Sequence, residues 1–73
     1  ETTNSLKHLG LPLIAVGEIQ GDEELKVKGR DFLRKVILRD GRIIGFRLVG
    51  DMRHAGVYHS LMIRQTDVSA YKR

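Results

Sequence analysis

The side chains in this sequence that could bind a metal ion are its histidines and one acidic cluster. His54 and His59 are five residues apart. On a helix they would point about 140° away from each other, which disfavours a two-histidine metal pair. The cluster Asp22-Glu23-Glu24 lacks the alternating ligands and the glycine of a calcium loop. We therefore interpret both sets as solvated surface residues and expect no metal site.

Nucleophilic catalysis and phosphate binding find no support in the other polar residues. Ser60 directly follows His59, and sequence neighbours on a helix do not face each other. The chain has no cysteine, which excludes a thiolate nucleophile, a thiolate zinc site and a disulfide scaffold. Gly41, Gly45 and Gly50 are spaced too widely for a phosphate-binding loop. We predict no catalytic or cofactor-binding residue in this chain.

The charge balance is basic, with 13 Lys and Arg against 9 Asp and Glu in 73 residues, and this length allows one small domain. A net charge of +4 suggests nucleic acid or an acidic protein as a partner. Phe32 and Phe46 follow the core pattern, so no base-stacking platform is evident and a nucleic-acid partner is disfavoured. Four basic residues could share one exposed area of a sheet: Arg34, Arg47, Lys26 and Lys28.

The sequence also bears on location. No apolar run approaches the ~20 residues that a membrane span needs, and no signal-peptide pattern is present. The lack of cysteine fits a reducing compartment. We expect a cytoplasmic protein without membrane contact.

Apolar periodicity predicts several strands followed by one helix. After Gly50 the period changes, Asp51 is a good N-cap, and an amphipathic helix is expected from Met52 to Gln65. The predicted fold is α+β: a small antiparallel sheet, a meander with a central β-hairpin, packed against one C-terminal helix. The strand segments are 11–16, 25–28, 32–38 and 43–49, in a single domain over residues 6–69 between a linker remnant at 1–5 and a loose tail at 70–73.

The strongest local signal is Asp40-Gly41 between two β-rich segments, which predicts a hairpin. A two-residue loop would pair Leu38 with Ile43 and put the apolar sets of the two strands on opposite faces. A three-residue loop, Arg39-Asp40-Gly41, would join those sets. We therefore expect the three-residue loop with a bulge, and Gly41 in the left-handed conformation.

The spacing of apolar residues predicts which side chains lie on the buried face of the helix and which lie on each face of the sheet. The helix should bury Ala55, Tyr58, Leu61, Met62 and Gln65. The sheet face away from the helix is too apolar for full solvation, and Gly45 offers a place where another backbone could approach closely. We expect this face to be covered by the chain's own first strand and loops, by other domains of a larger protein, or by a second copy. It carries Leu33, Lys35, Ile37, Ile43, Gly45, Arg47 and Val49.

The segment from Phe32 to Asp51 resembles the C-terminal domain of FAD-dependent pyridine nucleotide-disulfide oxidoreductases of the NADH–rubredoxin reductase type. The large subunit of NADH-dependent nitrite reductase carries a similar domain. The resemblance covers Leu6 to Ser69, and its most specific piece is Leu48-Val49-Gly50-Asp51. The chain departs from the pattern at Met52-Arg53-His54, where the family has small polar residues. The residues that carry the motif are structural: Asp40, Gly41, Gly45, Gly50 and Asp51.

The resemblance implies a packing or interface domain with no chemistry of its own. In such enzymes FAD and NAD(P)H bind to two preceding domains, and no catalytic residue of the family maps onto this chain. The implied partners are those upstream FAD and NAD(P)H domains, a second copy in a homodimer, and a redox protein acceptor. The alternative is a free-standing basic module that binds RNA or an acidic protein, supported only by the net charge of +4.

Overall fold

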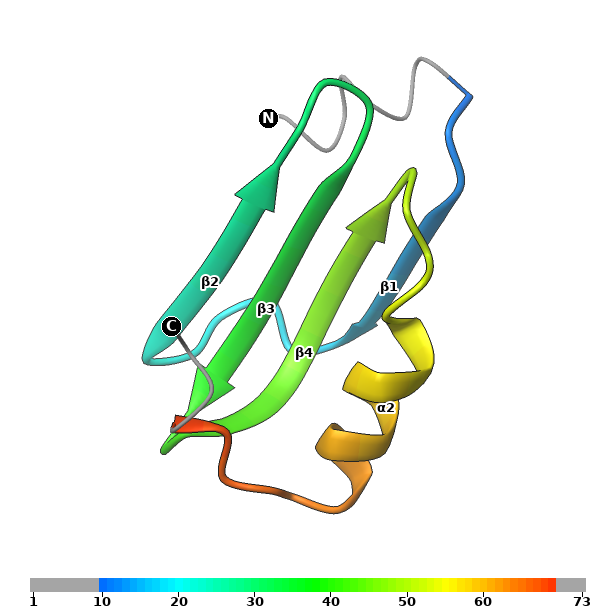
Figure 1. Ribbon diagram of the computed structural model, residues 1–73. Coiled ribbons are helices and arrows are strands. Elements are labelled where there is room, and N and C mark those ends of the chain that lie inside the picture. Colours follow the sequence, from blue (N-terminus) through cyan, green and yellow to red (C-terminus); the bar gives the residue numbers. More distant parts are fainter. Residues whose placement is uncertain (1–9, 70–73) are drawn as a thin grey trace.

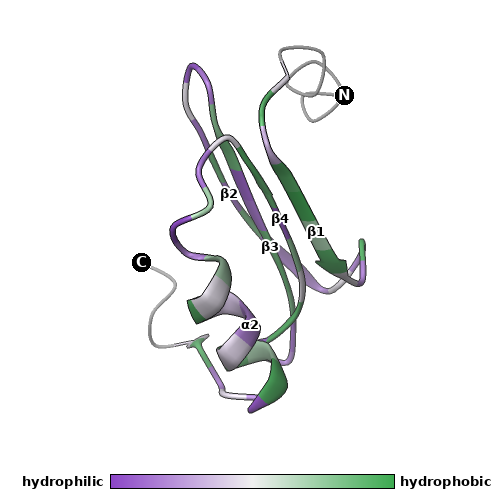
Figure 2. Cartoon of the chain, turned by 90° about the vertical axis from the view of Figure 1, so that its right-hand side faces the viewer, coloured by the Kyte–Doolittle hydropathy of each residue, from purple (hydrophilic) through white to green (hydrophobic). Residues whose placement is uncertain are grey.

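Four strands form one antiparallel sheet in the computed structural model, which describes residues 10–69 (Figure 1). They are β1 Leu13–Gly17, β2 Glu23–Lys28, β3 Leu33–Arg39 and β4 Arg42–Val49, and they lie in the order β1-β4-β3-β2. Helix α2, Ala55–Ile63, lies on one face of the sheet (Figure 2). The α+β class and the antiparallel sheet with its central hairpin are confirmed, with the meander running through β2, β3 and β4 and β1 added beside β4. Residues 1–5 and 70–73, predicted as remnant and tail, lie outside the described residues.

The turn of the central hairpin differs from the prediction. Arg39 pairs with Arg42, so the loop is the two residues Asp40 and Gly41, whose φ values are 53° and 75°. Positive φ at both positions belongs to the type I′ turn, whose twist matches that of the flanking strands. The predicted three-residue loop is therefore wrong.

A bulge in β4 brings the apolar side chains of the two hairpin strands to one face, which the predicted three-residue loop was expected to do. Leu38 pairs with Ile43, whereas Ile37 pairs with Gly45, so Ile44 is an extra residue. The bulge puts the apolar sets of both strands on one face, and it also moves Ile43 there. Ile43, predicted on the opposite face, is 4% exposed in the core beneath the helix.

The core on the helix side is built mainly from the hairpin. Ala55, Tyr58, Leu61 and Met62 of the helix pack against it, as predicted. Gln65 does not, because the helix ends at Ile63 and Gln65 is exposed. Val68, from the segment after the helix, closes this core. Its buried members are Val36, Leu38, Ile43, Phe46, Leu48 and Val68.

The face of the sheet away from the helix is covered by the chain itself. Leu33, Ile37 and Val49 are each at most 1% exposed. Leu11 packs against Leu33 and Val49, and the loop 18–22 crosses this face on its way from β1 to β2 (Figure 1). A side chain on Gly45 would overlap the Glu18 carbonyl oxygen, so the expected close backbone approach is confirmed.

Candidate docking groove on the helix side of the sheet

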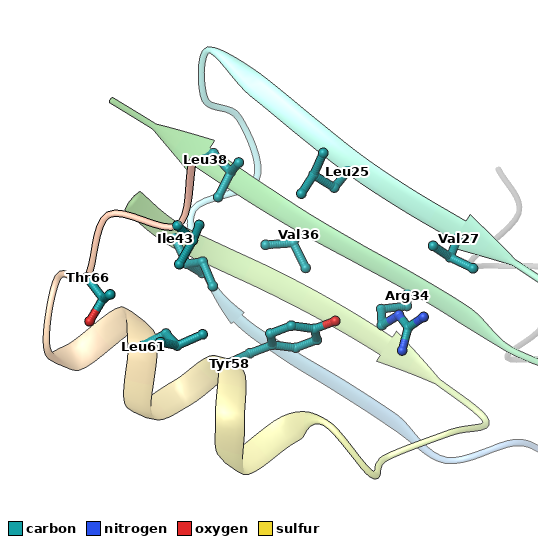
Figure 3. A pocket seen from close by; sticks show the side chains of 10 residues that line it. Leu25, Val27, Arg34, Val36, Leu38, Ile43, Tyr58, Leu61 and Thr66 are labelled. Carbon is teal, nitrogen blue, oxygen red and sulfur yellow. The ribbon is translucent and has the colours of Figure 1, made fainter. Parts of the chain in front are cut away.

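Helix α2 covers only part of the sheet. It packs mainly against β4, and within the described residues Leu25 of β2 stays half-buried and Val27 is exposed. This leaves a groove of about 640 Å³ between the helix and β2, seen in Figure 3. We call it the docking groove, and its lining residues are Leu25, Val27, Arg34, Val36, Leu38, Ile43, Tyr58, Leu61, Thr66 and Val68.

The lining of the docking groove is predominantly aliphatic. Val27 is 46% exposed, and Leu25 is half-buried. The volume lies within the roughly 300–1,000 Å³ of ligand pockets, but the groove is open to solvent along one side. An open apolar surface of this kind is typical of a contact with another apolar surface.

One end of the docking groove is polar. The Arg34 guanidinium donates a hydrogen bond to Nδ1 of His54 at 3.0 Å. The ring of His54 stacks on Tyr58 with a centroid distance of 5.9 Å. Because Nδ1 accepts this hydrogen bond, the neutral imidazole carries its proton on Nε2. Arg34 and Tyr58 therefore border the apolar lining, and His54 contacts both of them.

Asp51, the predicted N-cap, does not cap the helix. The residue before α2 is His54, which makes no capping side-chain hydrogen bond. The Asp51 carboxylate instead accepts hydrogen bonds from the Arg53 amide at 3.1 Å and from the Arg53 guanidinium at 2.7 and 2.9 Å. The guanidinium contacts, followed by the amide, hold the pKa of the Asp51 carboxyl well below its usual range. Asp51 therefore anchors the turn that precedes the helix, because the helix begins three residues later than an Asp51 cap requires.

The other residues of the family motif lie in turns or at places where two backbone segments come close together. The Gly41 carbonyl accepts a hydrogen bond from the Val68 amide at 2.7 Å. Gly50 has a φ of 82°, and a side chain there would overlap the Asp31 carbonyl oxygen. Asp40 and Gly41 lie at one end of the β3–β4 hairpin, whereas Gly50 and Asp51 follow its other end. The motif residues are therefore not brought together into one site.

The basic residues are divided between the two faces of the sheet. Arg34 pairs with Leu48 and lies on the helix side, where it borders the docking groove. Arg47 pairs with Lys35 and lies on the opposite face. The expectation that Arg34 and Arg47 share one exposed area is therefore wrong. Other basic side chains do share the face away from the helix, among them Lys26, Lys28, Lys35 and Arg47.

The described residues do not fit a dinucleotide cofactor. Before the amino end of α2, where a pyrophosphate would bind, lies the Asp51 carboxylate. The docking groove brings one cation, Arg34, to an otherwise mostly apolar lining. Within residues 10–69, no three His, Cys, Asp or Glu side chains are grouped so that they could hold a metal ion. The helix found in the same range is too short to cross a membrane.

Comparison with known proteins identifies one family. The family model for the rubredoxin NAD+ reductase C-terminal domain matches residues 3–66. No curated protein and no solved structure gives a significant match to the chain. Because the family model spans most of the chain, this protein belongs to the family of rubredoxin NAD+ reductase C-terminal domains.

Proposed function

We propose that this chain is the packing and interface domain of an FAD-dependent NAD(P)H oxidoreductase and carries no chemistry of its own. The observation that carries the proposal is the docking groove, which has a volume of about 640 Å³ and a predominantly aliphatic lining that includes the exposed side chain of Val27. Membership in the reductase family supplies the partner for such a surface, namely the rest of the reductase.

The surface that fills the docking groove would come from the preceding FAD and NAD(P)H domains of the same protein. Burying aliphatic side chains such as Val27 and Leu25 against a second domain removes apolar surface from water, which favours the contact. FAD and NAD(P)H would bind to those domains, because the residues described here do not fit a dinucleotide. A redox protein acceptor would dock on the assembled enzyme.

Spectroscopy of the 73-residue chain tests the absence of a cofactor site. We expect added FAD to keep the visible spectrum of free flavin and NADH to keep its free fluorescence, because the docking groove offers a single cation, Arg34, in an otherwise mostly apolar lining. A stoichiometric, perturbed flavin spectrum would show a cofactor site and contradict the proposal.

The natural protein tests the assignment to a reductase. We expect its sequence to hold two glycine-rich dinucleotide fingerprints before this domain, and the purified protein to oxidise NAD(P)H with bound FAD. A natural protein without these fingerprints would instead favour the free-standing basic module.

A further inference from the structure

Strand β2 has a free edge within the part of the chain that the structure describes. It pairs with β3 on one side only and ends the sheet order β1-β4-β3-β2. The Gly29 amide donates to the Phe32 carbonyl at 3.0 Å, which sets the alternation of hydrogen-bonded pairs along β2 and β3. By that alternation, the backbone N–H and C=O groups of Glu24 and Lys26 point away from β3, towards the free edge.

The charges along β2 change sign at its middle. The strand reads Glu23-Glu24-Leu25-Lys26-Val27-Lys28. Its even-numbered side chains lie on the face away from the helix, while Leu25 and Val27 line the docking groove. An antiparallel copy of the same strand would therefore present opposite charges to it.

Only certain registers satisfy the backbone of two such strands. The outward-facing groups belong to even-numbered residues, so even residues must pair with even residues. A register centred on Glu24 places two carboxylates opposite each other, and one centred on Lys26 places two ammonium groups opposite each other. Like charges directly across a strand pair are destabilising. The register centred on Leu25 avoids both, and pairs Glu24 of each copy with Lys26 of the other.

We infer that the free edge of β2 pairs with β2 of a second copy of this chain, antiparallel and centred on Leu25. The two sheets then form one continuous sheet about a two-fold axis perpendicular to it. Each copy offers the same patch to the other, as a two-fold interface requires. This inference concerns a second copy rather than the upstream domains, so it goes beyond the proposed function.

The pairing also adds a negative charge to a row of like charges that crosses the sheet of the single chain. Lys26 lies directly opposite Lys35 on β3, and Lys35 lies directly opposite Arg47 on β4. Glu24 is 4.0 Å from Lys35 and is the acidic side chain of this row. In the pair of copies, Glu24 of the second copy lies beside Lys26 and adds a negative charge to the row of cations.

The helix sides of the two copies face the same way in this arrangement. Leu25 lines the docking groove, and Leu25 of the second copy lies opposite it across the two-fold axis. The two docking grooves are therefore joined along β2 into one longer apolar channel. The partner copy contributes part of that channel.

Charge-reversal substitutions in β2 test the inference in the 73-residue chain. Glu24→Lys sets two ammonium groups against each other at both cross-strand pairs of the dimer, and Lys26→Glu sets two carboxylates against each other there. We expect each variant alone to weaken the dimer roughly tenfold or more in sedimentation velocity at low salt. A mixture of the two variants restores an ammonium opposite a carboxylate at both pairs, so we expect it to form a heterodimer. The double variant Glu24→Lys/Lys26→Glu should form a homodimer again.

Controls separate this interface from folding and from the proposed function. Glu18→Lys makes the same charge change at an exposed position outside β2, and it should leave the dimer intact. Lys26→Glu removes the repulsion between Lys26 and Lys35, so its loss of dimer would not reflect a weakened fold. A wild-type chain that stays monomeric to its solubility limit, or variants that dimerise as the wild type does without rescue in the mixture, would overturn the inference. Neither result alters the FAD and NADH measurements.

Discussion

At the scale of single residues, Gln65 is held in a conformation that suits glycine. Its φ is 54°, directly after the last turn of α2. The Gln65 amide donates to the Met62 carbonyl and the Thr66 amide to the Leu61 carbonyl, each at 3.2 Å. This pair of hydrogen bonds is the Schellman motif, in which a left-handed residue ends the helix. A side chain in the left-handed region carries a steric cost that glycine lacks.

We therefore expect Gln65→Gly to stabilise the domain by about 0.5 to 1 kcal/mol, because the backbone conformation is retained without the steric cost. Urea denaturation followed by circular dichroism measures the change. The matched control is Arg64→Gly, one residue earlier at φ −75°, which should destabilise the chain. If the two glycine variants behaved alike, the left-handed termination would not explain the position.

Asp51 carries a charge whose ionisation is tied to the local fold. Its pKa lies below the ordinary value of 3.8, mainly because the Arg53 guanidinium and then the Arg53 amide donate hydrogen bonds to the ionised carboxylate. Since the pKa is lowered in the folded state, the carboxylate adds stability above pH 3.8. That stability is lost as the pH falls through the folded-state pKa.

The expected consequence is a pH-dependent difference between the wild type and Asp51→Asn. The asparagine keeps the shape but not the charge, so the wild type should be the more stable protein near neutral pH. The difference in the free energy of unfolding should close as the pH falls below 3.8, and it should shrink in high salt. Denaturation curves at several pH values measure it, and a difference that does not change with pH would contradict the ion pair.

At the scale of elements, the connection from β1 to β2 depends on the absence of a side chain at Gly45. The Glu18 amide donates to the Ile44 carbonyl at 2.9 Å, which brings the loop 18–22 against β4 at its bulge. A Cβ atom on Gly45 would overlap the Glu18 carbonyl oxygen and lie 2.7 Å from the Glu18 nitrogen. The loop can therefore cross the sheet only over a glycine.

Gly45→Ala should destabilise the domain by about 1 to 3 kcal/mol, because backbone rather than a flexible side chain must move. Gly56→Ala provides the opposite control within the same chain. A Cβ atom on Gly56 would meet nothing within 4 Å, and the residue lies inside α2. That variant should gain about 0.5 to 1 kcal/mol through helix propensity. Thermal unfolding of both variants measures the contrast, and equal shifts would show that the loop does not require the glycine.

At the scale of the whole molecule, the sheet is covered unequally on its two faces. The loop 18–22 and Leu11 cover the apolar hairpin residues Leu33, Ile37 and Val49 on the face away from the helix. On the helix side, α2 leaves the docking groove open over β2 and β3. The docking groove therefore lies on the helix side, whereas the alternation of apolar residues in the sequence pointed to the opposite face.

Ile37 shows the difference between an internal contact and an interface. It is 1% exposed and lies against the loop at Gly21. Ile37→Thr should cost about 2 to 4 kcal/mol in the free energy of unfolding, because it removes buried apolar volume and buries a hydroxyl group. The same change at Ile63, which is 67% exposed, should cost little. Denaturation and sedimentation would be run together, and reduced self-association of a fully stable Ile37→Thr would restore the interface interpretation.

Local patterns along the chain were enough to locate the elements of this protein. A short apolar run located the first strand, period-two alternation located the others, and Asp40-Gly41 located the hairpin. The three- and four-residue steps of Ala55, Tyr58 and Leu61 located the buried face of the helix. These features depend on local geometry and on the side-chain period, which a single sequence displays directly. Gly45 was also found in this way, since a glycine within a strand indicates close backbone approach.

The way those elements meet depends on the folded chain. The β4 bulge moved Ile43 to the helix side, and no local pattern distinguishes a bulge inside a strand from a longer loop. The start of α2 was set by the Asp51–Arg53 turn, and the burial of Val68 by its hydrogen bond to Gly41. The docking groove arises because α2 packs on β4 and not across the whole sheet. The bulge, the burial of Val68 and the groove rest on contacts between segments that are separate along the chain, and sequence periodicity carries no information about such contacts.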